Sequence, residues 1–227
     1  MNEINKFYQS LLSDIVSLQA GNEEGDIQEQ IFTRLAIEML AEAGETENAA
    51  IAYDEKALGT RNQHKINAYA ISDNYETVDL FISIFDNSET IKNISKADIE
   101  TATKRITNFF RKAIYNDYAN EVADFQELKD NLVRVNVIIL TNGEYKGDFP
   151  QSATICGYHM FYRVTDTNYL YKISEQSRVP IELDFEDFEG EKFEIPCLSA
   201  PTDNPDYKSY IAIIPGTCLA KLYEKYG

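Results

Sequence analysis

Several carboxylates, one lysine and one amide in this chain are of the types that could act together on a phosphodiester. Metal-dependent cleavage of that bond needs two or three carboxylates around a divalent cation, and usually a lysine beside the attacking water. The cation neutralises developing charge, and the lysine orients or deprotonates the water. In chain order, the residues of suitable type are Glu29, Glu38, Lys65, Asn67 and Asp79.

Two positions lack the groups that this chemistry demands most. Asn67 occupies the strand position that should bring an acid to the cation, and an amide offers no charge. The next strand should carry an acid and, two residues later, a lysine, but Ile82, Ser83 and Ile84 stand there instead. Lys65 precedes Asn67 on the same strand face and could supply a positive charge from a different place. A nuclease site here would therefore be rearranged or lost.

A purely structural interpretation of the same residues stays open. Glu29 would cap a helix, Asp79 would face solvent at the start of a strand, and Asn67 would satisfy a local hydrogen bond. The two histidines, His64 and His159, are too isolated in the sequence to predict a catalytic pair.

The elements that must position these residues are predicted by apolar periodicity and by cap signals. Asp26 with Glu29, and Ser95 with Asp98, predict capping boxes, and Gly44 predicts a helix end. The strand near 77–85 is apolar on both faces, which is typical of an inner strand, and the strand near 133–140 is predicted to be central. Helices are expected at about 3–20, 27–43, 96–117, 119–130, 166–175 and after 216, and strands at about 49–54, 65–72, 77–85, 133–140, 153–164, 179–185, 193–198 and 208–214.

This order of elements predicts an α/β (α+β) fold with a mixed β-sheet core flanked by helices. We expect a helix-plus-sheet core over residues 1–150 and a mixed strand and helix extension over 151–227, packed on that core. The final helix is still running at "LAKLYEKYG", so we expect the chain to be the N-terminal fragment of a longer protein.

The charge of the chain argues against general binding of nucleic acids. The 38 acidic residues outnumber the 21 basic ones, and the net charge of −17 repels a phosphate backbone at long range. One local exception is the basic side of the helix near 96–117, which could contact phosphates or could equally be a solvated helix face. Its members are Lys104, Arg105, Arg111 and Lys112.

Other classes of chemistry find little support in the sequence. The three cysteines, Cys156, Cys197 and Cys218, have no metal-binding spacing, and we expect buried reduced thiols. No cofactor is predicted, and Mg²⁺ or Mn²⁺ would be needed only by a nuclease. The sequence has no apolar run long enough to cross a membrane and no secretory signal, so a cytoplasmic location is the expectation.

Four stretches of the chain resemble the bacterial abortive-infection phage-resistance (AIPR) family, over nearly the whole length. They are "YKSYIAIIPGTCLAKLYEKYG" (207–227), "IPCLSA" (195–200), "YLYKIS" (169–174) and "INAYAISDNYETVDLFISIF" (66–85). The resemblance implies a role in phage defence and an N-terminal domain similar to restriction-endonuclease folds. Family members that look active carry an aspartate at or near Asn67 and a Gln- or Glu-x-Lys at the place of Ile82 to Ile84.

This chain departs from that pattern at both places, and only Glu29 or Glu38 could match the helix acid. We therefore expect a degenerate restriction-endonuclease-like core that acts as a non-catalytic recognition or assembly module, with protein partners or the rest of its own chain. Two alternatives stay open. One is a metal-dependent nuclease using Glu29 or Glu38, Asp79 and Lys65, and the other is a nucleic-acid-binding domain that does not cleave.

Overall fold

The computed structural model describes residues 2–21, 27–46, 49–114, 128–174, 184–185, 188, 190, 192–200 and 209–226. The chain divides into two compact units, Met1–Arg178 and Val179–Gly227, and each is described by itself. The first unit extends beyond residue 150 and includes two further strands and a helix.

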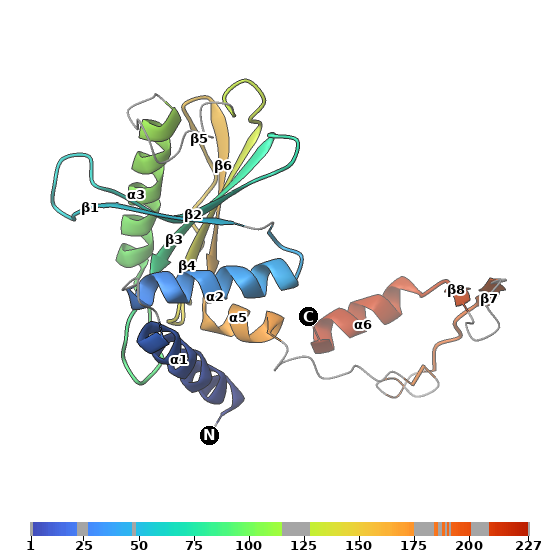
Figure 1. The fold of residues 1–227 in the computed structure, drawn as a ribbon. Coiled ribbons are helices and arrows are strands. Elements are labelled where there is room, and N and C mark those ends of the chain that lie inside the picture. The colour runs from blue at the N-terminus through green and yellow to red at the C-terminus, as the bar shows by residue number, and fades with distance from the viewer. Residues whose placement is uncertain are drawn as a thin grey trace. The chain divides into compact units, whose positions relative to one another are not determined.

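The first unit contains four described helices and six strands (Figure 1). Most lie close to the predicted positions, but the single strand predicted near 153–164 is a hairpin of two strands with a turn at 156–157. The region predicted as a helix over 119–130 lies mostly outside the described residues, and 128–131 form a turn. The elements are α1 (Glu3–Gly21), α2 (Gln28–Glu42), β1 (Ala50–Lys56), β2 (His64–Ile71), β3 (Thr77–Ile84), α3 (Lys96–Ile114), β4 (Arg134–Thr141), β5 (Ala153–Ile155), β6 (Tyr158–Thr165) and α5 (Thr167–Ile173).

The six strands form one mixed sheet in the order β1-β2-β3-β4-β6-β5. β1, β2 and β3 form an antiparallel meander, β3 runs parallel to β4, and β4 runs parallel to β6. Parallel neighbours need a crossover connection, and α3 lies in the crossover from β3 to β4. The short β5 closes the far edge as a hairpin with β6. The unit is therefore an α+β fold.

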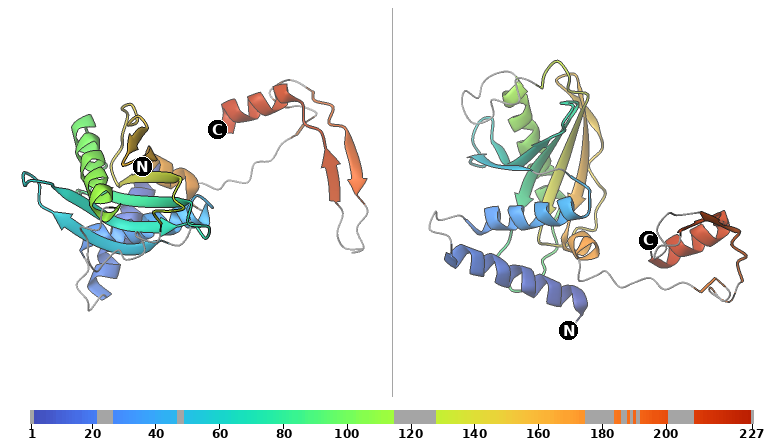
Figure 2. Two further views of the ribbon diagram at one scale, coloured as in Figure 1. Left: turned by 90° about the horizontal axis from the view of Figure 1, so that it is seen from above. Right: turned by 45° about the vertical axis from the view of Figure 1, so that its right-hand side comes forward.

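Helices cover both faces of the sheet, so that two apolar clusters form. The larger cluster lies between the sheet and α3, and includes Ile82, Ile106 and Val137. The other lies between the sheet and α1, α2 and α5, and includes Phe32, Phe81 and Leu170. The left view of Figure 2 shows α3 on the opposite side of the sheet from α1 and α2. β3 supplies residues to both clusters, as predicted for an inner strand, and β4 is central as predicted.

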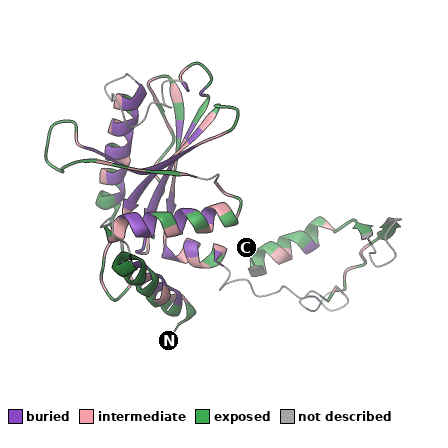
Figure 3. Cartoon of the chain, in the orientation of Figure 1, coloured by how far each residue is buried: buried purple, intermediate pink, exposed green. Residues whose placement is uncertain are grey.

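Burial follows this layering (Figure 3). β3 and β4 are buried along most of their length, whereas the first residues of β4 and much of β6 alternate between buried and exposed. One stretch of the sheet near the amino ends of these strands is therefore open on the face that α2 and α5 only partly cover.

The helix ends confirm two of the three predicted cap signals. Ser95 and Asp98 form the capping box of α3, with the Asp98 amide donating to Ser95 Oγ at 3.2 Å and the Ser95 amide donating to Asp98 Oδ2 at 3.1 Å. Gly44 follows α2 with a φ of 74°, as expected after a helix.

The predicted capping box of α2 is wrong. Its N-cap is Ile27, which has no side-chain cap, and Asp26 lies outside the described residues. The Glu29 carboxylate bonds to side chains of β2 instead.

The second unit holds the hairpin of β7 (Cys197–Ala200) and β8 (Ser209–Ala212), followed by α6 (Gly216–Tyr226). The strand predicted near 179–185 falls almost wholly outside the described residues. All three cysteines are free, but only Cys218 is buried, so the expectation of three buried thiols is wrong for Cys156 and Cys197. None of the described helices has both the length and the apolar character that a membrane span requires.

Candidate functional site

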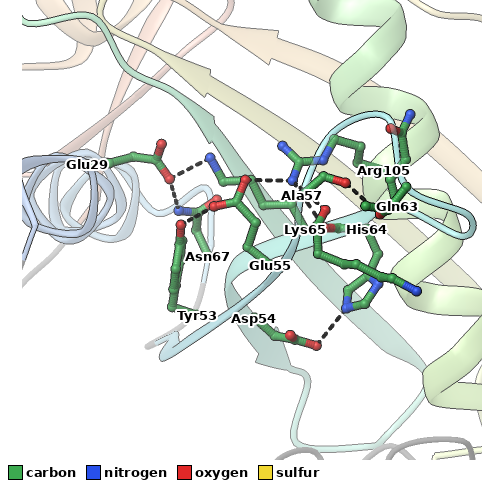
Figure 4. A network of polar contacts seen from close by, with 12 residues as sticks. Glu29, Tyr53, Asp54, Glu55, Ala57, Gln63, His64, Lys65, Asn67 and Arg105 are labelled. Carbon is green, nitrogen blue, oxygen red and sulfur yellow. Dashed lines mark hydrogen bonds and ion pairs between the residues drawn. The ribbon is translucent and has the colours of Figure 1, made fainter.

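Three of the residues singled out in the sequence meet on the α2 face of the sheet (Figure 4). The Lys65 ammonium lies 2.6 Å from Glu29 Oε1, and the Asn67 side-chain amide donates to the same oxygen at 2.7 Å. Glu29 comes from the first turn of α2, whereas Lys65 and Asn67 come from β2. We call Glu29, Lys65, Asn67 and their fourth partner, Ser83 of β3, the polar cluster.

The side chains of β2 take over backbone hydrogen bonding at the end of the β2–β3 ladder. The register of that ladder runs from Ile71–Val78 to Ala68–Phe81. Beyond it, the Ser83 amide donates to Asn67 Oδ1 at 2.9 Å, and Lys65 Nζ donates to the Ser83 carbonyl at 3.0 Å. Buried backbone groups must be paired, so Lys65 and Asn67 stabilise β3 at this point.

The hydroxyl of Ser83 completes the link from sheet to helix. Its Oγ lies 2.6 Å from Thr33 Oγ1, one turn beyond Glu29 on α2, and this hydrogen bond is buried. The polar cluster and Thr33 therefore connect α2 to β2 and β3 through contacts between side chains.

Ile82 and Ile84 do not face the polar cluster. Both side chains pack in the larger apolar cluster, between α3 and the opposite face of the sheet, because neighbouring strand residues alternate between faces. The residue of this run that reaches Glu29, Lys65 and Asn67 is Ser83. The interpretation of Ile82 and Ile84 as residues that replaced an acid and a lysine at this site is thus corrected by their orientation.

The two remaining acids lie elsewhere. Glu38 is exposed on α2, in a groove between α2 and β1. Asp79 accepts hydrogen bonds from Thr46 at 2.8 Å and from Asn136 at 2.7 Å, so it is half-buried and bonded rather than facing solvent. It precedes Ser83 by four residues on β3, which is about 13 Å along a strand. Asp79 and Glu29 therefore do not share one cation site.

A second group of polar residues lies next to the polar cluster, and the sequence did not predict that its members meet. Tyr53 and Glu55 lie on the edge strand β1, and Arg105 reaches Glu55 from α3, with its Nη2 atom 2.6 Å from Glu55 Oε1. The Tyr53 hydroxyl donates to the other oxygen of Glu55. The sequence held little signal for this group, because alternating charges on an edge strand are common on solvated surfaces.

The pKa values of this second group follow from its contacts. Burial pushes the pKa of the Glu55 carboxyl upward, but hydrogen bonds from Tyr53 and Arg105 and the charge of Lys65 outweigh burial and hold the pKa below its ordinary value. Burial, and next the hydrogen bond to Glu55, raise the pKa of Tyr53. Glu55 is therefore held as a carboxylate and Tyr53 as a neutral phenol at neutral pH.

Arg105 cannot be part of a surface that contacts nucleic acid. It is 6% exposed, and besides Glu55 it bonds to the backbone carbonyls of Lys56 and His64. This corrects the prediction that it lies on a basic side of α3. Lys104 and Arg111 are exposed and Lys112 is half-buried. Without Arg105, these three residues are what remains of the predicted basic side.

His64 has a structural contact, in line with the structural interpretation of its sequence position. Its Nε2 atom lies 3.1 Å from Asp54 Oδ2, and this contact joins β1 to β2.

The chemistry available to the polar cluster is limited by its own pairing. Glu29 keeps 20% of its side chain exposed, whereas Lys65 keeps 7%. The positive charge of Lys65 is already opposed by Glu29. Within the described ranges, no three or more His, Cys, Asp or Glu residues are grouped so that they could hold a metal ion.

Comparison with known proteins adds one match. The family model described as the abortive infection phage resistance protein N-terminal domain matches residues 32–172, which is more than half of the chain. The matched range covers β1 to α5 and includes Lys65, Asn67 and Ser83. Comparisons with curated proteins and with solved structures gave no match.

Proposed function

The chain belongs to the abortive infection phage resistance family, and on that premise we propose that it is a non-catalytic recognition or assembly module of a bacterial phage-defence protein. In this proposal the module works in the cytoplasm. It serves an effector activity that resides in a protein partner or in another part of the same protein.

The observation that carries the proposal is the position of Lys65. A nuclease lysine must approach a water molecule or a phosphate oxygen. The Lys65 ammonium instead lies between Glu29 and the Ser83 carbonyl, in a side chain that is 7% exposed. Freeing it would leave a carboxylate and a buried carbonyl without their cation. These contacts support a structural role for the polar cluster.

A degenerate restriction-endonuclease-like core is the finer part of the proposal. The order of elements supports it, with α2 followed by the meander β1-β2-β3, the crossover helix α3 and the parallel strand β4. Asn67 would then occupy the place that a family member with nuclease activity fills with an aspartate, and Ser83 is the residue of β3 that lies beside it. Neither residue carries a charge to attract a cation.

The experiment that tests the non-catalytic role is a calorimetric titration with Mn²⁺, run beside a plasmid-nicking assay. We expect neither stoichiometric binding nor nicking. The result that would contradict the proposal is micromolar binding with nicking that disappears in Glu29→Gln. Glu38→Gln is the matched control, since Glu38 is an exposed acid on the same helix.

A nucleic-acid-binding role has less support. The net charge of −17 and the burial of Arg105 both oppose it. A filter-binding assay with duplex DNA at low salt checks this point. Tight binding that weakens steeply with salt, and that Arg111→Gln reduces, would favour a nucleic-acid partner instead of a protein.

A further inference from the structure

A polar hollow lies on the open stretch of the sheet, away from the polar cluster. It consists of two adjoining cavities of about 350 and 320 Å³ that share Glu45, Asp79 and Asn136 as lining residues. Each is large enough for a small metabolite. The register places Asp79, Asn136 and Phe161 side by side on β3, β4 and β6. Glu45, in the turn after α2, forms one wall.

Arg134 is positioned in this hollow by contacts with an amide and an aromatic ring, neither of which carries a negative charge. Its Nε atom donates to Asn136 Oδ1 at 2.7 Å, and its guanidinium lies 4.4 Å from the centre of the Phe161 ring. Across the part of the chain that the structure describes, Arg134 forms no ion pair. A guanidinium carries five N–H donors, so four remain after the bond to Asn136. In a chain of net charge −17, an oriented arginine without a carboxylate partner indicates a place for an anion.

The two carboxylates that line the hollow already accept hydrogen bonds from the protein. Glu45 accepts from Arg163 at 2.5 Å and also from the Tyr169 hydroxyl, so that carboxylate is neutralised within the protein. Asp79 receives only neutral donors, from Thr46 and Asn136. Each of its oxygens has further lone pairs that could accept from a ligand hydroxyl. Arg134 therefore presents a cation and Asp79 an acceptor, with one amide between them.

The spacing of these two groups limits the ligand. Asn136 joins Arg134 and Asp79 by two hydrogen bonds of 2.7 Å each. With the width of the amide included, Arg134 Nε and the Asp79 carboxylate oxygen are at most about 8 Å apart. A sugar phosphate spans such a distance, with its phosphate at one end and hydroxyl groups a few atoms away. A simple anion would satisfy Arg134 and leave Asp79 unused.

We propose that this hollow binds a sugar phosphate, either free or as part of a nucleotide, with the phosphate on the Arg134 guanidinium and sugar hydroxyls donating to Asp79. The site does not depend on the proposed function, because none of its residues belongs to the polar cluster. Binding of such a molecule would give the module a chemical signal to recognise.

The test is calorimetric titration of the 227-residue chain with five probes: ribose 5-phosphate, adenosine 5′-monophosphate, adenosine, inorganic phosphate and citrate. We expect both phosphate esters to bind more tightly than millimolar, and adenosine, phosphate and citrate to bind far more weakly. The tighter of the two esters tells a nucleotide source from a free sugar phosphate. Arg134→Gln and Asp79→Asn should each weaken ester binding about tenfold or more.

Arg61→Gln is the matched control, because it removes an exposed arginine from the loop between β1 and β2 and should leave binding unchanged. Arg134→Lys keeps the charge and loses the fork-shaped donor set, so binding should fall with it as well. Circular dichroism and thermal melting show that each variant is folded. Three results would overturn the proposal: no ester binding at millimolar concentration, equal binding by Arg134→Gln, or citrate binding as tight as that of the esters.

Discussion

The Lys65 ammonium and the Glu29 carboxylate lie 2.6 Å apart, and this contact joins the second strand of the sheet to the first turn of α2. Lys65 is nearly enclosed, whereas Glu29 keeps a path to solvent. A buried cation beside a single carboxylate is stable only while its partner is present.

Replacement of Lys65 should cost stability. In Lys65→Met the apolar stem is kept, but Glu29 and the Ser83 carbonyl lose their donor, and we expect a loss of about 2–3 kcal/mol in the free energy of unfolding. Urea denaturation measures it. Lys104→Met changes an exposed lysine of α3 and should stay within about 0.5 kcal/mol of the parent. A double-mutant cycle with Glu29→Gln should show coupling, and strictly additive effects would contradict a direct contact.

Asn67→Asp should be destabilising at neutral pH and less so in acid. The substitution removes the amide that donates to Glu29 and places a second carboxylate against it, at a cost of about 2 kcal/mol. The two carboxylates repel each other only while both are ionised, so the penalty is present at neutral pH and fades as the pH falls and one of them takes up a proton. Melting temperatures at several pH values check this.

The control for Asn67→Asp is Asn131→Asp, an exposed turn residue that should show little change. Addition of Mn²⁺ gives a second measurement. A rise in melting temperature confined to Asn67→Asp would show that the polar cluster can hold a cation once residue 67 is an acid. If Asn67→Asp is as stable as the parent protein at neutral pH, the hydrogen bond from Asn67 to Glu29 is not formed in solution.

Arg105 and Arg111 should behave differently although both lie on α3. Arg105→Gln leaves Glu55 and two backbone carbonyls without their donor, and we expect a loss of about 2–3 kcal/mol. Arg111→Gln should be close to neutral, because Arg111 is exposed. Equilibrium unfolding of the two variants decides the matter, and equal effects would mean that Arg105 is not buried as described.

The Glu55 carboxylate should make stability depend on acid pH. Its pKa in the folded state lies below the ordinary 4.5, so the unfolded chain binds the proton more readily. Its contribution is present above pH 4.5 and is lost as the pH falls through the folded-state pKa. Glu55→Gln should flatten the decline of unfolding free energy in acid, whereas Glu38→Gln, an exposed acid, should leave it unchanged. Parallel pH curves for Glu55→Gln and the parent protein would argue against the bond to Arg105.

The sequence by itself determined the elements and much of their order. Spacings of three and four residues predicted α1, α2 and α3, and runs of apolar residues predicted β2, β3 and β4, because these patterns reflect which residues one face of a helix or strand buries. The capping box at Ser95 and the glycine after α2 were predicted for the same reason, since each depends on neighbours in the chain. Family membership was predicted too, from four short stretches of sequence that resemble the family.

Only the tertiary structure decided what the polar residues do. Glu29 had a suitable position for a capping residue, but it bonds to Lys65 and Asn67, because folding brings β2 under the first turn of α2. Arg105 was predicted to lie on a basic side of its helix, but it is buried against β1. The end of the β2–β3 ladder brought Ser83, rather than Ile82 or Ile84, to the polar cluster. Such contacts join residues far apart in the chain, so local patterns carry no signal for them.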